Sequence, residues 1–110
     1  MAKHERAPRR DASSPTGWRV KNMRHVHRED EITWIAPSSG SDKTGITITF
    51  PPGGNPLEPE GSASAKPGEK ITKKVKKGAA DGRYPYTLFC HEDRKEAEGD
   101  KSPPELIIEP

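Results

Sequence analysis

A chain of 110 residues is long enough for one small domain. Only 28% of the residues are hydrophobic and 33% are charged, so the core must be small, and no stretch is apolar enough to cross a membrane. The net charge of +2 does not by itself imply a nucleic-acid partner, and the single cysteine excludes an intramolecular disulfide and a four-cysteine zinc site.

Residues 1–16 are charged, contain prolines and serines, and have no large apolar side chain after Met1. This composition predicts a disordered basic tail at 1–16, followed by one folded domain at 17–110. The tail lacks the apolar segment of a secretory signal, so we predict a cytoplasmic location for the chain as written. If a signal peptide precedes it, we predict a periplasmic or extracellular location.

Alternating apolar and polar residues predict β-strands in three segments of the first half of the domain, at 18–26, 32–36 and 46–50. His25 and His27 lie two residues apart, a spacing that can serve a metal. The segment around them is so polar that exposed side chains are the preferred interpretation.

Residues 51–68 are rich in Pro and Gly, which predicts a long connection with local turns, anchored by Leu57. The segment 68–78 resumes the strand pattern, with Ile71 and Val75 inward and Lys73 between them. We expect Lys73 to bury its stem while its amine stays in water. The lysines of this segment are typical of an edge strand protected against aggregation.

The most hydrophobic run extends from Tyr84 to Cys90 and predicts the central strand of the domain, with Tyr84, Tyr86, Leu88 and Cys90 on one face. A charged loop at 91–102 follows. Residues 105–109 predict a last strand that is covered on both sides or paired deep within a sheet.

Three local patterns in this order resemble the cupredoxin family. They are a polar turn followed by Ile-Thr-Trp at 29–34, Gly-Arg-Tyr-Pro-Tyr at 82–86, and Glu-Leu-Ile-Ile at 105–108. The resemblance covers the chain from about Gly17 to Pro110. It implies an all-β domain, a small Greek-key sandwich of two sheets.

The copper ligands of that family do not carry over. The resemblance implies a first histidine around Lys43-Thr44-Gly45, where this chain has no imidazole. Cys90 lies two residues later than the usual cysteine, His91 follows it directly, and no methionine or further histidine comes after. A blue-copper centre needs two imidazoles and a thiolate in one place, so we predict no metal and no cofactor.

Cys90 is therefore interpreted as a small buried hydrophobe, with a metal ligand or a reactive thiol as the alternative. Neighbouring residues on a strand point to opposite faces, so Cys90 and His91 do not form a nucleophile and base unless folding brings them together. No catalytic triad, phosphate loop or carboxylate pair is present, and we predict that the chain is not an enzyme.

The leading hypothesis is a non-catalytic binding or structural module, a monomer whose unidentified partner is another protein. One alternative is a degenerate copper-binding or electron-transfer protein that uses Cys90 and His91 with His25 or His27. A third is weak nucleic-acid binding through the lysines of Lys70 to Lys77, although no exposed aromatics accompany them.

Overall fold

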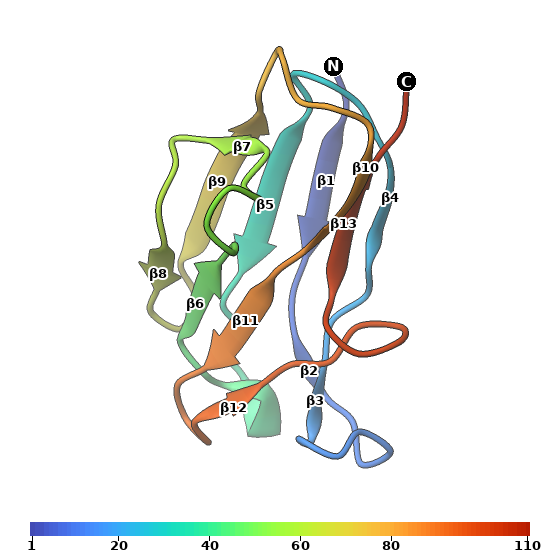
Figure 1. Ribbon diagram of the computed structural model, residues 1–110. Helices are drawn as coiled ribbons and strands as arrows, with labels where there is room; N and C mark the ends of the chain where they lie inside the picture. The colour runs from blue at the N-terminus through green and yellow to red at the C-terminus, as the bar shows by residue number, and fades with distance from the viewer.

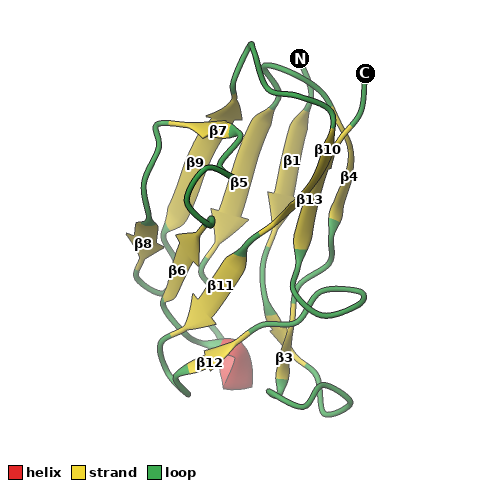
Figure 2. Cartoon of the chain, in the orientation of Figure 1, coloured by secondary structure: helices red, strands yellow, loops and turns green.

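The computed structural model describes all residues from 1 to 110, and its only helical segment is one short 3-10 turn (Figures 1 and 2). No helix is long and apolar enough to pass through a bilayer. In chain order the elements are β1 (Lys3–Arg6), β2 (Arg9–Arg10), β3 (Trp18–Arg19), β4 (Met23–Val26), β5 (Glu31–Ile35), η1 (Gly40–Asp42), β6 (Ile46–Thr49), β7 (Leu57–Glu58), β8 (Ala63–Ala65), β9 (Lys70–Val75), β10 (Gly82–Pro85), β11 (Thr87–Cys90), β12 (Lys95–Glu96) and β13 (Glu105–Ile108).

The strands form a β-sandwich. One layer is the sheet β1-β5-β9-β7, and the sheets β12-β11-β6-β8 and β10-β13-β4 face it (Figure 1). A two-stranded ribbon of β2 and β3 closes one end, while the two chain termini lie at the other end. The predicted all-β sandwich is therefore confirmed at the level of class and layers.

The alternating pattern of the sequence places the apolar side chains between the layers. Ile32 and Trp34 on β5 face Ile46 and Ile48 on β6, and each of these side chains is at most 1% exposed. Burying an aliphatic or aromatic side chain of this size contributes about 1.5–3 kcal/mol, so these alternating positions hold the sandwich together. The predicted inward faces of these strands are confirmed.

The run Tyr84–Cys90, predicted as one central strand, is two strands in different sheets. β10 pairs with β13, whereas β11 pairs with β6 and β12. The break falls at Pro85, which has no N–H to donate, and at Tyr86, whose N–H donates to the carbonyl of Pro104 at 3.0 Å instead of to a neighbouring strand. One apolar run thus contributes a strand to each of the two sheets, β10-β13-β4 and β12-β11-β6-β8, that together form the second layer.

An aromatic cluster lies where this break meets the opposite layer. The ring centroids of Trp34 and Tyr86 are 5.2 Å apart, and those of Phe50 and Tyr86 are 5.3 Å apart. The indole N–H of Trp34 donates a buried hydrogen bond of 3.1 Å to the Tyr86 hydroxyl. Burial raises the pKa of Tyr86 to about 12, so this hydroxyl stays neutral and able to accept.

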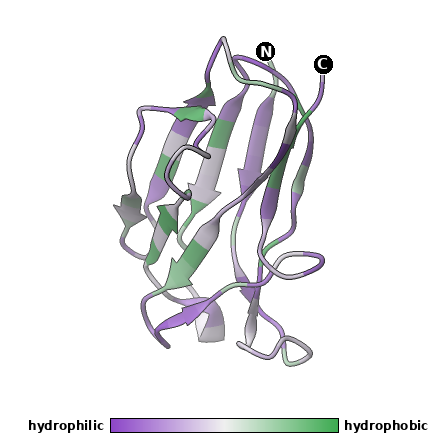
Figure 3. Ribbon diagram, in the orientation of Figure 1, coloured by the Kyte–Doolittle hydropathy of each residue, from purple (hydrophilic) through white to green (hydrophobic).

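The expectation that residues 1–16 form a disordered tail is wrong, because they build β1 and β2. β1 runs parallel to β5 although it is hydrophilic along its length (Figure 3). Asp30 holds it there: its carboxylate accepts from the Ala2 N–H at 2.9 Å and lies 2.9 Å from Nε2 of His4. Composition missed this strand because backbone pairing and one buried carboxylate hold it, not apolar side chains.

The connection at 51–68 is also more ordered than predicted. It contains β7 and β8, and Leu57 is fully buried, which confirms its predicted anchoring role. Lys73 is 6% exposed, and its amine donates to the carbonyls of Pro59 at 2.7 Å and Gly61 at 2.9 Å. The expectation that this amine stays in water is therefore wrong, and burial lowers its pKa.

Replacing Tyr86 with Phe tests the bond between the layers. It leaves the buried Trp34 N–H without a partner, which should lower the free energy of unfolding by about 1–3 kcal/mol in urea titrations. Tyr84→Phe is the matched control, because the Tyr84 hydroxyl donates to Ala80 at an exposed position. A loss in Tyr86→Phe no larger than in the control would contradict the assigned role.

Replacing Asp30 with Asn tests the anchoring of β1. Burial alone would raise the pKa of Asp30, but hydrogen bonds from His4, His27 and Ala2 bring it below its ordinary value. The stabilisation is therefore present above the ordinary pKa and is lost as the pH falls through the lowered value, below about pH 4. Amides of β1 should exchange hydrogen about tenfold faster or more in Asp30→Asn at neutral pH.

The matched control is Asp81→Asn, which neutralises an exposed carboxylate that pairs with Arg28 and has no contact with β1. It should leave exchange in β1 unchanged. If Asp30→Asn also leaves β1 protected, or if the wild-type strand keeps its protection well below about pH 4, Asp30 is not the anchor.

Candidate functional site

Cys90 ends β11 in the interior of the sandwich, opposite Ile46 of β6 and Lys95 of β12. Its side chain is fully buried, as predicted from its alternation with Tyr86 and Leu88. Burial raises the pKa of the thiol to about 12, with Arg10 acting in the opposite direction and Asp93 adding to the rise. The thiolate that a copper ligand or a nucleophile requires is therefore disfavoured at neutral pH.

A cluster of polar and aromatic side chains lies beside Cys90. The Arg10 guanidinium lies 4.2 Å from the centre of the Trp18 ring, pairs with Asp93, and donates to the Ser41 carbonyl at 2.9 Å. The Trp18 indole N–H donates to the Asp93 carboxylate at 3.0 Å. Hydrogen bonds from Arg10 and then Trp18 lower the pKa of Asp93, so it stays ionised and keeps the cluster together.

Sequence reasoning missed this cluster because Arg10 lies in the segment predicted to be disordered. The alternation at 18–26 marks Trp18 only as an apolar strand residue, and Asp93 lies in the segment 91–102 that the sequence predicts to be a charged loop. The order Cys-His-Glu-Asp after a buried strand is the one local sequence feature that points to a polar cluster near Cys90. No pattern in the sequence connects this feature to Arg10.

His91 lies on the opposite face from Cys90, as predicted for neighbours on a strand. Its backbone N–H donates to the Gly45 carbonyl at 2.9 Å, and its Nε2 lies 2.7 Å from the Thr47 hydroxyl on the exposed face of β6. A Cβ atom at Gly45 would come within 2.6 Å of Nδ1 of His91. A side chain at Gly45, one of the three residues around which the family resemblance implies the first copper histidine, would therefore collide with the His91 ring.

His25 and His27 lie at the other end of the sandwich, beside the C-terminal segment. Nδ1 of His25 is 3.2 Å from the Glu109 carboxylate, and Nε2 of His27 is 3.4 Å from it. Figure 1 shows this end, where β4 runs up to the termini, far from the end of β11. No group of three or more histidine, cysteine or acidic side chains surrounds a common point in the structure.

The lysines of 70–77 do not form one surface. Lys73 points inward, and the amine of Lys76 contacts Glu60 and the Asn55 carbonyl. β9 also lies inside its sheet, between β5 and β7, and not at a fully free edge. On that side, β7 pairs only with Lys74 and Val75 of β9. The prediction of an edge strand is therefore correct only for the remaining residues of β9.

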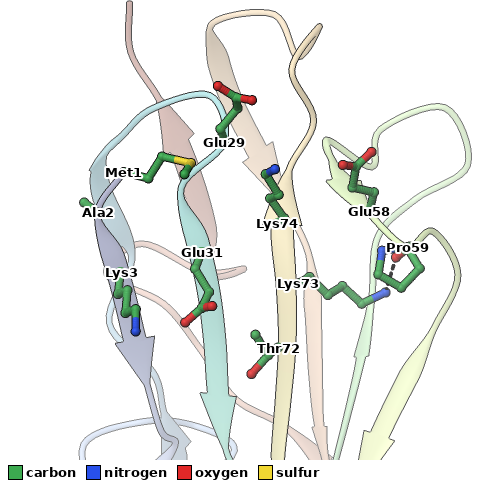
Figure 4. A pocket seen from close by; sticks show the side chains of 10 residues that line it. All are labelled: Met1, Ala2, Lys3, Glu29, Glu31, Glu58, Pro59, Thr72, Lys73 and Lys74. Carbon is green, nitrogen blue, oxygen red and sulfur yellow. Dashed lines mark hydrogen bonds between the residues drawn. The ribbon is translucent and has the colours of Figure 1, made fainter.

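A hollow of about 480 Å³ lies on the outer face of the sheet β1-β5-β9-β7 (Figure 4). Alternating charges cross it, because Lys3 pairs in register with Glu31, Glu31 with Lys74, and Lys74 with Glu58. Opposite charges on neighbouring strands stabilise the pairing of those strands. The row therefore has a structural explanation without a ligand.

No family model and no curated protein matches this chain. The geometry described above is therefore the basis for assigning a function. It shows a buried cysteine, one outward histidine and one pair of histidines beside Glu109, and these are not brought together into one centre.

The reactivity of Cys90 can be measured directly. At about pH 8 a thiol with a pKa of about 12 has a thiolate fraction roughly a thousandfold below that of an ordinary cysteine, and burial slows it further. The native protein should react with a disulfide reagent at least about a thousandfold more slowly than the urea-unfolded protein. Comparable rates in the two states would show that the thiol is accessible.

Proposed function

We propose that this chain is a non-catalytic binding or structural module of cupredoxin-like fold without a copper centre. The single observation that carries the proposal is the arrangement around Cys90. Its thiol is buried beside the Arg10–Trp18–Asp93 cluster, while the imidazole of His91 is directed to the opposite face. A thiolate and two imidazoles cannot meet there without rearrangement of both faces.

The strand arrangement supports the finer assignment of a Greek-key sandwich. Consecutive strands change layers, since β5 lies in one layer, β6 in the other, and β9 again with β5. β13 also pairs with β10, with Leu106 opposite Tyr84, so the last strand lies beside the Gly-Arg-Tyr-Pro-Tyr segment, whereas β11, the strand that ends at Cys90, pairs with β6 and β12. Fold alone does not determine activity, so the functional part of the proposal depends on the site.

The alternative of a degenerate copper protein requires His25 or His27 to join Cys90 and His91. Their position beside Glu109, at the other end of the sandwich, opposes it. The nucleic-acid alternative requires a continuous basic surface along residues 70–77. The internal contacts of Lys73 and Lys76 oppose that reading.

Copper titration of the reduced protein tests the proposal. We expect no thiolate-to-copper absorption band with Cu(II), and no chemical-shift change at Cys90 with either Cu(I) or Cu(II), because the buried thiol has no second ligand nearby. Cys90→Ser is the control and should bind as the wild type does. A stoichiometric visible band that disappears in Cys90→Ser would overturn the proposal.

A further inference from the structure

The outer face of the sheet β12-β11-β6-β8 has no acidic side chain, lysine or arginine on three of its strands. The segments 45–49, 62–65 and 87–91 contain β6, β8 and β11 and hold none of these residues, although they make up 33% of the chain. The outer face of the opposite sheet, in contrast, carries the row of alternating charges. An uncharged outer face in so polar a protein matches a partner without charge.

Hydroxyl groups take the place of charges on this face. Thr47 and Thr49 of β6 point outward, since the residues between and before them are buried. The hydroxyl oxygen of Thr47 lies 2.7 Å from that of Ser64, and the hydroxyl oxygen of Thr49 lies 3.1 Å from that of Ser62. A hydroxyl both donates and accepts, so this row matches a ligand whose own polar groups are hydroxyls.

The imidazole of His91 extends the hydroxyl row. A Cβ atom at Gly45 would come within 2.6 Å of Nδ1 and 3.3 Å of Cε1, so the absence of a side chain there lets the ring lie against the sheet. Nε2 of His91 is 2.7 Å from the Thr47 hydroxyl, and the centroids of the His91 and Phe89 rings are 6.1 Å apart. Two aromatic rings are thus held next to each other on the surface of the sheet.

The ring of Phe89 is not used by the core. Every other Trp, Tyr and Phe residue belongs to the core cluster or packs against it, whereas Phe89 is half-buried on the outward side of β11. A hollow of about 330 Å³ adjoins Phe89, and the charges of Arg94, Lys95, Glu96 and Glu98 along it balance. An aromatic wall with a few polar groups in a hollow of this size is typical of a small-ligand site.

We propose that the face formed by Thr47, Thr49, Phe89 and His91, with the hollow beside Phe89, binds a neutral oligosaccharide. The C–H groups on the face of a sugar ring pack against an aromatic ring, and the sugar hydroxyls exchange hydrogen bonds with Thr, Ser and His side chains. The face extends over four residues of a strand, about 13 Å, which leaves room for more than one sugar ring. A nucleic acid fits poorly, because its phosphates require cationic groups that these three strands lack.

This inference rests on the proposed function of a binding module and names its class of ligand. Its test is titration of the full chain with three neutral tetrasaccharides, cellotetraose, maltotetraose and mannotetraose, followed by NMR. We expect at least one of them to give saturable shifts at Thr47, Thr49, Phe89 and His91. A heparin tetrasaccharide, which carries sulfate groups on similar rings, should give none at this face. Absence of shifts with all three neutral sugars, or shifts there with heparin alone, would overturn the site.

Substitutions on the face distinguish a site from unspecific contact. Phe89→Ala removes the stacking surface and should weaken binding about tenfold, whereas Phe89→Trp keeps an aromatic ring and should bind at least as well as the wild type. Thr47→Val removes one hydroxyl at nearly constant volume and should weaken binding about fivefold. Phe89 lies outside the core cluster and Thr47 faces outward, so these variants should unfold close to the wild-type urea concentration.

Thr72→Val is the matched control, because it makes the same change on the outer face of the opposite sheet, where Thr72 contacts Thr33. It should bind the sugar as the wild type does. If Phe89→Ala and Thr47→Val bind no more weakly than Thr72→Val, the site is overturned. The proposal about Cys90 stays intact in that case, because the copper titration reads the buried thiol and not this face.

Discussion

The hydrogen bond from the Trp34 indole to the Tyr86 hydroxyl joins the two layers at the place where the chain passes from the sheet β10-β13-β4 into the sheet β12-β11-β6-β8. Tyr86 stands between β10 and β11, so its side chain fixes where one sheet ends and the next begins. The Phe50 ring also packs against Tyr86, with the two ring centroids 5.3 Å apart. β11 then leads directly to Cys90, and the position of the cysteine therefore depends on this junction.

The fold class and the inward faces of the main strands could be predicted from the sequence, because period-two alternation reports directly which side chains are buried. The failures share a different cause. β1 is charged, β7 and β8 are two and three residues long, and the amine of Lys73 is satisfied by carbonyls of a turn distant in sequence. Each depends on backbone or polar pairing between distant segments, which a local apolar pattern does not encode.

The candidate site was predictable in part for the same reason. Alternation correctly placed Cys90 inside and His91 outside, and the missing histidine near Gly45 was visible from the sequence. The Arg10–Trp18–Asp93 cluster was not, since it joins three segments. The contact of His25 and His27 with Glu109 likewise depends on a bulge that no residue pattern announces.

The row of alternating charges across the outer face of the sheet β1-β5-β9-β7 constrains the register in which β1 pairs with β5. If β1 slipped by two residues, the same side chains would stay outward, but Glu5 would stand opposite Glu31 and His4 would leave Asp30. Like charges on neighbouring strands oppose pairing, and the buried carboxylate would lose its partner. Charged side chains therefore set the register of β1 against β5, whereas apolar side chains set the register of the interior strands.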